Sequence, residues 1–133
     1  MVVDTSAVIA ILQREPERRN FLEALEGADV RRMSFATLVE VSMVIESRHG
    51  QSGLRALDLF LSRAEFEFIA VDRKQAYLAR EAFSRFGKGR HRAGLNFGDC
   101  FSYALAMFLG EALLCKGVDF PLTDVMIVSA STS

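Results

Sequence analysis

The sequence predicts an α/β fold in which a mainly parallel sheet of four to five strands lies between two layers of helices. Two observations predict it. Short apolar runs alternate with helical segments along the whole chain, which favours strands joined by helical crossovers. No linker, repeat or low-complexity tract interrupts this alternation, so residues 1–133 are expected to form a single domain. A domain of this length buries roughly two thirds of the surface of its unfolded chain, which is enough to hold a rigid site.

The first half of the chain begins with an apolar stub that polar residues follow at once, which is typical of a buried strand. Pro16 suits the first turn of a helix, and Gly27 is expected to end that helix. Gly50 is expected to end a later helix whose apolar residues follow helical spacing. In order, the expected elements are a strand over 1–4, a helix that begins with 7–12 and ends near 14–16, a helix over 16–27, a strand over 29–34, and helices over 37–50 and 53–64.

The second half contains an alternating run over 66–71, which predicts a strand, and Asp72 is then expected to cap a helix. A long apolar segment after a glycine-rich loop predicts the last helix. The expected elements are a strand over 66–71, helices over 72–87 and 97–109, a buried strand over 112–115 and a short strand over 125–128.

Composition limits the class of protein. Half of the residues are hydrophobic and the formal net charge is −1, and no apolar run approaches the length of about 18 residues that a membrane span requires. The N-terminus lacks the basic region of a secretory signal. Cys100 and Cys115 lie in apolar segments without CxxC spacing, which indicates buried free thiols rather than a disulfide or metal ligands. We therefore expect a cytoplasmic protein without a membrane contact.

Four carboxylates stand where the expected elements begin or end: Asp4, Glu40, Asp99 and Asp119. The carboxyl ends of parallel strands form the crevice in which open α/β sheets keep their sites, so folding is expected to bring these acids together. Converging carboxylates repel one another and are costly to desolvate unless a cation neutralises them. Oxygen ligands with almost no histidine or cysteine nearby favour one or two Mg²⁺ or Mn²⁺ ions over Zn²⁺.

Each acid also has a structural interpretation. Glu40 fits the last position of a capping box that starts at Thr37. Asp99 has a similar place after Asn96, which is a good N-cap. The other two acids would cap a helix or organise a turn. Four acids at such places exceed what capping requires, which favours a functional cluster.

Neighbouring polar residues are candidate helpers of the cluster. The hydroxyl groups of Thr5 and Ser6 are placed to orient Asp4 or a water molecule, although Ser6 equally suits an N-cap. Asn96 is expected to cap the helix that carries Asp99, with phosphate contact as the alternative.

A basic segment covers residues 73–92, where seven lysine and arginine residues face one acid, Glu81. The alternative is a solvated helix face. Within the segment, the glycine-rich loop over 87–94 carries Lys88, Arg90 and Arg92, which are expected to contact the phosphates of a nucleic acid. His91 is expected to be an exposed loop residue, with general acid catalysis as the alternative. The aromatic residues Phe97, Phe101, Phe108 and Phe120 are expected in the core.

Four sequence blocks, over residues 3–7, 34–40, 94–100 and 113–120, together resemble a PIN-domain nuclease of the VapC toxin type. The resemblance covers essentially the whole chain. It implies a three-layer α/β/α PIN-like fold and an Mg²⁺- or Mn²⁺-dependent endoribonuclease. It also implies a homodimer that a VapB-type antitoxin inhibits.

Mapped by these blocks, Asp4, Glu40, Asp99 and Asp119 take the acidic positions of the family. Many members carry two acids near the last of these blocks, whereas this chain has Gly117 at the first position and Asp119 at the second. Asp124 is therefore a candidate substitute or helper for the fourth ligand.

An antitoxin is expected to place an Arg or Lys side chain among the acids, because a guanidinium pairs bidentately with carboxylates. Its tail is expected in an apolar groove lined by Ile9, Leu12, Leu54 and Leu57. Two other functions remain open at this point. One is an Mg²⁺-dependent phosphatase with Asp4 as the nucleophile, and the other is a non-catalytic RNA-binding module.

Overall fold

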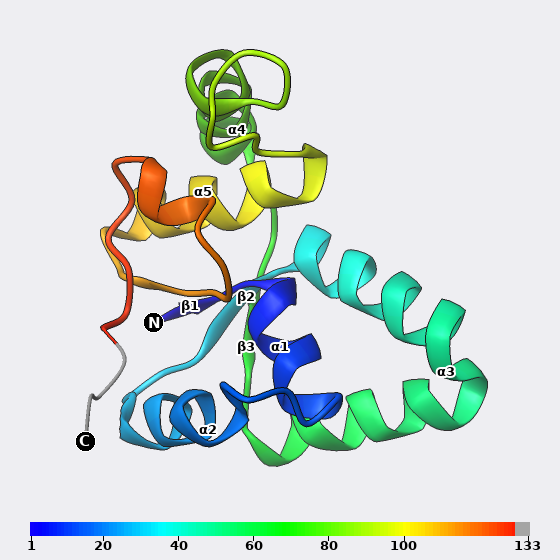
Figure 1. The fold of residues 1–133 in the computed structure, drawn as a ribbon. Helices are drawn as coiled ribbons and strands as arrows, with labels where there is room; N and C mark the ends of the chain where they lie inside the picture. Colours follow the sequence, from blue (N-terminus) through cyan, green and yellow to red (C-terminus); the bar gives the residue numbers. More distant parts are fainter. Residues whose placement is uncertain (130–133) are drawn as a thin grey trace.

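The computed structural model of the chain describes residues 1–129 and contains one parallel sheet (Figure 1). Its strands are β1 (Val2–Val3), β2 (Arg32–Ser34), β3 (Glu67–Ile69) and β4 (Leu113–Leu114). They are arranged in the order β3-β2-β1-β4, and all three pairings are parallel. The first strand in the sequence, β1, is thus an inner strand of the sheet. Asp4, which follows it, therefore lies near the middle of the carboxyl-terminal edge of the sheet.

The helices are α1 (Thr5–Leu12), α2 (Arg18–Gly27), α3 (Phe35–Arg63), α4 (Arg73–Phe86) and α5 (Phe97–Leu109), with a 3₁₀ turn, η1, at Phe120–Leu122. Figure 1 shows α4 and α5 on one side of the sheet and α1, α2 and α3 on the other. The predicted three-layer α/β/α arrangement with a parallel sheet is confirmed.

Two hydrophobic cores lie on the two faces of the sheet, because successive strand residues point in opposite directions. Val2 and Leu113 belong to the core beneath α4 and α5. Val3 and Leu114 belong to the core shared with α1, α2 and α3. All four side chains are buried. Burial on both faces explains why β1 and β4 are short apolar runs rather than alternating ones.

The two helices expected over 37–50 and 53–64 are present as the two halves of α3, which meet at Gly50, where the backbone leaves the helical conformation with φ 65° and ψ −156°. Only glycine adopts this conformation without strain, so Gly50 ends the first half and turns the chain into the second. Other helix boundaries differ by a few residues, since α1 begins at Thr5 and α3 at Phe35. The helix expected from residue 16 begins at Arg18.

The strand expected over 125–128 is reduced to a single parallel bridge between Leu113 and Ile127. Hydrogen bonds join the Leu113 amide to the Met126 carbonyl at 2.8 Å and the Val128 amide to the Leu113 carbonyl at 2.9 Å. The segment therefore covers the edge of the sheet beyond β4 without continuing as a strand. Among the helices described, none is long and apolar enough to cross a membrane.

Candidate functional site

Three of the predicted acids come to the carboxyl-terminal edge of the sheet from three different elements. Asp4 directly follows the central strand β1, Glu40 lies in the second turn of α3, and Asp99 lies in the first turn of α5. Asp4 is almost fully buried, while Glu40 and Asp99 are partly buried. This is the edge at which open parallel sheets keep their sites.

Both oxygens of the Asp4 carboxylate accept hydrogen bonds. Oδ2 accepts from the Ser6 amide at 3.0 Å and from the Ser6 hydroxyl at 2.8 Å, and Oδ1 accepts from the Ser102 hydroxyl at 2.6 Å. Ser6 in turn accepts from the Lys116 amide at 2.9 Å. Asp4 thus caps α1, as the structural interpretation expected, and α5 also fixes its carboxylate through Ser102.

Glu40 does not cap its helix, so the capping-box interpretation of this residue is wrong. The N-cap of α3 is Ser34, whose hydroxyl accepts from the Ala36 amide at 3.1 Å. Glu40 instead accepts a hydrogen bond from the Thr5 hydroxyl at 2.5 Å. Burial raises the pKa of Glu40, and the nearby charge of Asp4 raises it further. Thr5 therefore orients Glu40, whereas the sequence suggested that it would orient Asp4.

Asp99 does form the capping box expected with Asn96. The Asn96 amide donates to Asp99 Oδ2 at 3.0 Å, and the Asp99 amide donates to Asn96 Oδ1 at 2.9 Å. The pKa of Asp99 is nevertheless raised to about 6, first by burial and then by the charges of Asp4, Glu40 and Asp119. Asp99 thus caps α5 and at the same time lies close to the other acids.

Asp119 and Asp124 lie farther from the centre of this arrangement. Asp119 is exposed, precedes η1 without a capping hydrogen bond, and is the last of the three acids that raise the pKa of Asp99. Asp124 accepts from the Tyr103 hydroxyl at 2.5 Å and pairs with Arg85 at 3.3 Å. These contacts fasten the chain after η1 to α4 and α5, so this structure gives Asp124 no contact with the acids.

We call Asp4, Glu40 and Asp99, with Asp119 at the rim, the acid site. Its donors are carboxylate oxygens, the ligands that Mg²⁺ and Mn²⁺ prefer. The raised pKa values of Glu40 and Asp99 show that their charges are poorly compensated by the protein alone. Within residues 1–129, no three His, Cys, Asp or Glu side chains already stand in a metal-holding arrangement. The acid site thus fits a divalent cation in the chemistry of its donors and not in their present spacing.

Two residues of the site were missed by the sequence reasoning. Ser102 is fully buried in α5, and its only sequence signal is a hydroxyl group within an apolar helix, three residues after Asp99. Lys116 follows β4, and its ammonium group pairs with Glu15 at 2.5 Å and Glu17 at 3.3 Å. These ion pairs join the loop after β4 to the loop between α1 and α2.

Cys100 and Cys115 are both free thiols, as predicted. Burial raises the pKa of Cys115 to about 12, and the charges of Asp4 and Asp99 add to the effect. This thiol therefore stays protonated beside the acids and is a poor soft-metal ligand, since thiolate is the form that binds.

The predicted RNA-contacting residues Lys88, Arg90 and Arg92 are all exposed on the loop before α5. In the described part of the chain none of them forms an ion pair, and the Arg90 guanidinium lies over the Phe83 ring at 5.2 Å. The loop is ordered by its backbone, because the Lys88 amide donates to the Leu95 carbonyl and the Leu95 amide to the Phe86 carbonyl, each at 2.9 Å.

His91 is not an exposed loop residue, and that expectation is wrong. Its ring is partly buried against Phe86, with 5.2 Å between the centroids and an edge-on geometry. Nδ1 accepts a hydrogen bond from the Ala93 amide at 3.0 Å. The imidazole thus helps to shape the loop, with Nδ1 as the acceptor.

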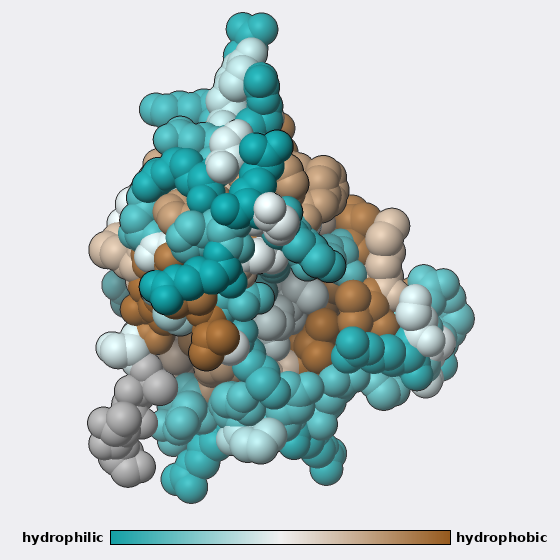
Figure 2. Space-filling model, turned by 45° about the horizontal axis from the view of Figure 1, so that its top comes forward, coloured by the Kyte–Doolittle hydropathy of each residue, from teal (hydrophilic) through white to brown (hydrophobic). Residues whose placement is uncertain are grey.

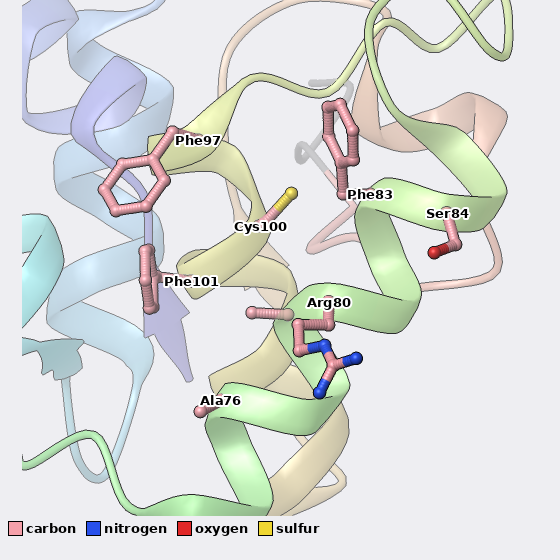
Figure 3. Close-up of a pocket in the computed structure, with 8 residues that line it drawn as sticks. Ala76, Arg80, Phe83, Ser84, Phe97, Cys100 and Phe101 are labelled. Carbon is pink, nitrogen blue, oxygen red and sulfur yellow. The ribbon is translucent and has the colours of Figure 1, made fainter.

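Phe97 was expected in the core but is 80% exposed, because it occupies the first turn of α5 on a side that no other element covers. Its ring packs edge-on against Phe101 with 4.9 Å between the centroids. Figure 3 shows Phe97 and Phe83 on opposite sides of Cys100, in a hollow of about 570 Å³ between α4 and α5. Phe120, in contrast, is buried as expected.

The groove expected along α1 and the second half of α3 is only partly formed. Leu57 is fully buried and belongs to the core, so it is not available as an anchor. A hollow of about 240 Å³ lies instead at the α3 kink, lined by Leu12, Ile45, His49, Ser52, Gly53 and Ala56. Figure 2 shows hydrophobic residues (brown) on the flank where α1 and α3 lie, and hydrophilic ones (teal) over α4 and the loop that follows it.

Comparison with known proteins agrees with this geometry. A ribonuclease VapC of Mycolicibacterium smegmatis is 57% identical over 132 residues, which cover 96% of this chain and 99% of the relative. Ribonuclease VapC30 of Mycobacterium tuberculosis is 51% identical over 129 residues, 97% of this chain and 98% of the relative.

The crystal structure of VapC20 from M. tuberculosis, a sarcin-ricin loop cleaving toxin, shares the fold with a TM-score of 0.77 at 18% identity, over 96% of this chain and 97% of that one. VapBC2 of Rickettsia felis, solved with a fragment of promoter DNA, gives a TM-score of 0.75 at 18% identity, over 96% of each chain. The family model of the PIN domain matches residues 1–125. The predicted resemblance is confirmed, and the chain belongs to the PIN-domain family.

Proposed function

We propose that this protein is a divalent-metal-dependent endoribonuclease and the toxin of a type II toxin–antitoxin pair. The observation that carries the proposal is the acid site itself, in which β1, α3 and α5 present Asp4, Glu40 and Asp99 at one edge of the sheet. Burial, together with the charges of Asp4, Glu40 and Asp119, raises the pKa of Asp99 to about 6. Full-length relatives named VapC ribonucleases, at 50–57% identity, support the choice of RNA as substrate.

Asp4 and Asp99 would hold one or two Mg²⁺ or Mn²⁺ ions, with Glu40 and Asp119 as further ligands or as holders of a water molecule. When bound, such an ion polarises the phosphate and lowers the pKa of the attacking water. The protein's own groups do the positioning. Ser6 fixes one oxygen of Asp4, Thr5 fixes Glu40, and Asn96 fixes Asp99.

The RNA backbone would be held by Lys88, Arg90 and Arg92. The loop that carries them leads directly into α5, whose first turn holds Asp99, so cations and acids are adjacent along the chain. An acid site without metal repels phosphate, and exposed cations beside it offset this repulsion and steer the substrate. Arg90, stacked on Phe83, is already held in place for such contact.

The proposed partner is a VapB-type antitoxin. Solved relatives of the same fold, such as VapBC-1 of Haemophilus influenzae, are VapBC complexes. The cation of an antitoxin Arg or Lys would neutralise Glu40 and Asp99, whose charges the protein leaves poorly compensated. The hollow at the α3 kink, beside the partly buried Leu12, would receive an apolar anchor of the same partner.

A homodimer is the proposed assembly. Phe35, Val39 and Met43 follow one another at a spacing of four on α3 and are 48%, 52% and 64% exposed. They form an exposed apolar row along α3, of the kind that marks a protein interface. A second copy in the cytoplasm would cover it. Mass measurement of wild type and of Val39→Lys by light scattering tests this, with a dimer expected only for wild type.

The main test is cleavage of single-stranded and structured RNA. We expect cleavage that needs added Mg²⁺ or Mn²⁺ and stops with EDTA. Asp4→Asn and Asp99→Asn should each lower the rate more than a hundredfold, because an ion ligand is lost. Both variants should keep the wild-type circular dichroism spectrum. Cleavage at an equal rate in a chelated sample would reject the proposal, as would loss of activity that merely follows unfolding.

A further inference from the structure

The Asp4 carboxylate rests on a pair of buried hydroxyl groups that come from the two helices beside it. Ser102 of α5 is 0% exposed, and its Oγ lies 2.6 Å from Asp4 Oδ1. Thr37 of α3 is 1% exposed, and its Oγ1 lies 3.3 Å from Ser102 Oγ. The three groups form a continuous chain from α3 through α5 to the end of β1.

The donor and acceptor roles in this series of hydrogen bonds follow from the chemistry of the Asp4 carboxylate. An ionised carboxylate can only accept, so the single hydroxyl hydrogen of Ser102 is donated to Asp4. Ser102 then has only acceptor positions left, and Thr37 must donate to it. Each hydrogen bond therefore polarises the next one in the same direction, from Thr37 through Ser102 to Asp4.

Within residues 1–129, Ser102 hydrogen-bonds only to Asp4 and Thr37 through its side chain. A serine inside a helix commonly bonds the carbonyl of the preceding turn, but the hydroxyl here leaves its own helix for Asp4. The surrounding positions of α5 are apolar and buried, namely Cys100, Tyr103, Ala104, Leu105 and Ala106. An unbonded hydroxyl in such a place is costly.

The hydrogen bonds to Asp4 also determine which of its lone pairs remain available. Each carboxylate oxygen has two acceptor directions. Ser6 fills both directions of Oδ2 with its amide and its hydroxyl. Ser102 fills one direction of Oδ1 and leaves the other. The same bond therefore sets the plane of the carboxylate and the oxygen that stays open.

We propose that Ser102, supported by Thr37, is a positioning residue that holds Asp4 with one Oδ1 lone pair open to a divalent cation. The inference rests on the proposed function, because it assigns the ligand direction within the acid site. Groups that orient metal ligands typically change metal affinity 10- to 100-fold when they are removed. Ser102 should belong to this class although it touches neither metal nor substrate.

The test measures Mn²⁺ binding to the metal-free protein by calorimetry, without RNA. Ser102→Ala should raise the dissociation constant about 10-fold or more. Thr37→Val keeps the shape of its side chain and should raise it by a smaller factor. The double variant Ser102→Ala/Thr37→Val should have the same dissociation constant as Ser102→Ala, because Thr37 acts only through Ser102. The matched control is Ser42→Ala, whose hydroxyl bonds Leu38 within α3 and should have no effect.

A second readout follows the carboxylate itself. In Ser102→Ala without metal, the ¹³C resonance of the Asp4 carboxylate should shift, while Ser42→Ala should leave it unchanged. Wild-type Mn²⁺ affinity in Ser102→Ala, or additive effects of the two variants, would overturn the inference. If Ser102→Ala fails to fold, Thr37→Val decides alone, and an unchanged affinity counts against the proposal. Failure of wild type itself to bind Mn²⁺ would instead reject the proposed function.

Discussion

The carboxylate of Glu40 on α3 lies directly against the backbone of Gly98 in the first turn of α5. A Cβ atom built on Gly98 would overlap both oxygens and the carboxyl carbon of Glu40. The φ angle of Gly98 is not positive, so backbone conformation does not demand glycine here. The absence of a side chain is what lets Glu40 reach the acids that α5 and β1 present.

Gly98→Ala should therefore impair the site more than the fold. The end of a flexible Glu side chain moves aside at little cost, and alanine favours a helix over glycine by up to about 1 kcal/mol. We expect unfolding stability within about 1 kcal/mol of wild type and an RNA cleavage rate lowered at least 10-fold. Gly27→Ala, where a Cβ meets no atom within 4 Å, is the control. If Gly98→Ala cleaved RNA at the wild-type rate, the position of the Glu40 carboxylate against Gly98 would not matter for cleavage.

Asp99→Asn should stabilise the metal-free protein at neutral pH. Its folded pKa of about 6 exceeds the ordinary value of 3.8, so the folded state holds its proton more tightly than the unfolded state. Stability from this group is complete below about pH 4 and is lost as pH rises through about 6. The Asn oxygen can still accept from the Asn96 amide. We expect a gain of roughly 1 to 3 kcal/mol at pH 7 and almost none at pH 4.

Urea unfolding in EDTA at both pH values measures this difference. Asp58→Asn, which removes an exposed carboxylate of α3, is the matched control and should show no such pH dependence. Added Mn²⁺ should reverse the order at pH 7, because wild type binds the ion and the variant has lost a ligand. A variant that is no more stable than wild type at pH 7 would mean that burial and the neighbouring acids do not disfavour the charged form of Asp99 in the folded protein.

The sequence predicted those parts of the site that depend on local order along the chain. Asp4 follows the first strand at once, and Asp99 belongs to a capping box, so each position could be recognised from adjacent residues. The contact of Ser102 with Asp4 spans 98 residues and depends on how α5 rotates above β1. No periodicity reveals such a rotation.

Exposure was the other limit of sequence reasoning. Phe97 has the apolar context of a core residue, yet it is 80% exposed because the packing of α4 against α5 leaves that face of the first turn uncovered. At Gly50, in contrast, local sequence sufficed, because a glycine with φ 65° ends the first half of α3 where the sequence placed that end. Tertiary packing, which the sequence does not reveal, decided the exposure of Phe97.

Asp124→Asn should lower stability and leave metal-dependent cleavage nearly intact. Asp124 accepts from the Tyr103 hydroxyl and pairs with Arg85, and burial together with Asp124 raises the pKa of Tyr103. Loss of the charge should weaken both contacts by about 1 kcal/mol in total. Tyr103→Phe should destabilise by a similar amount, and the two effects should not add. A hundredfold loss of activity in Asp124→Asn would assign this residue to the acid site instead.

Replacement of Lys88, Arg90 and Arg92 together by Ala should weaken RNA binding and flatten its dependence on salt. Each phosphate contact to a single strand contributes about 0.7 to the slope of log K against log salt, so three lost contacts should reduce its magnitude by about 2. Fluorescence anisotropy with a labelled RNA, at several salt concentrations and with Asp4→Asn as the parent to prevent cleavage, measures this slope. Arg19, Arg55 and Arg63, changed to Ala together, give the same loss of charge on α2 and α3 and should barely alter the slope. Mn²⁺ affinity should stay unchanged in both triple variants. If the two triple variants showed the same slope of log K against log salt, net charge, rather than the loop before α5, would hold the RNA.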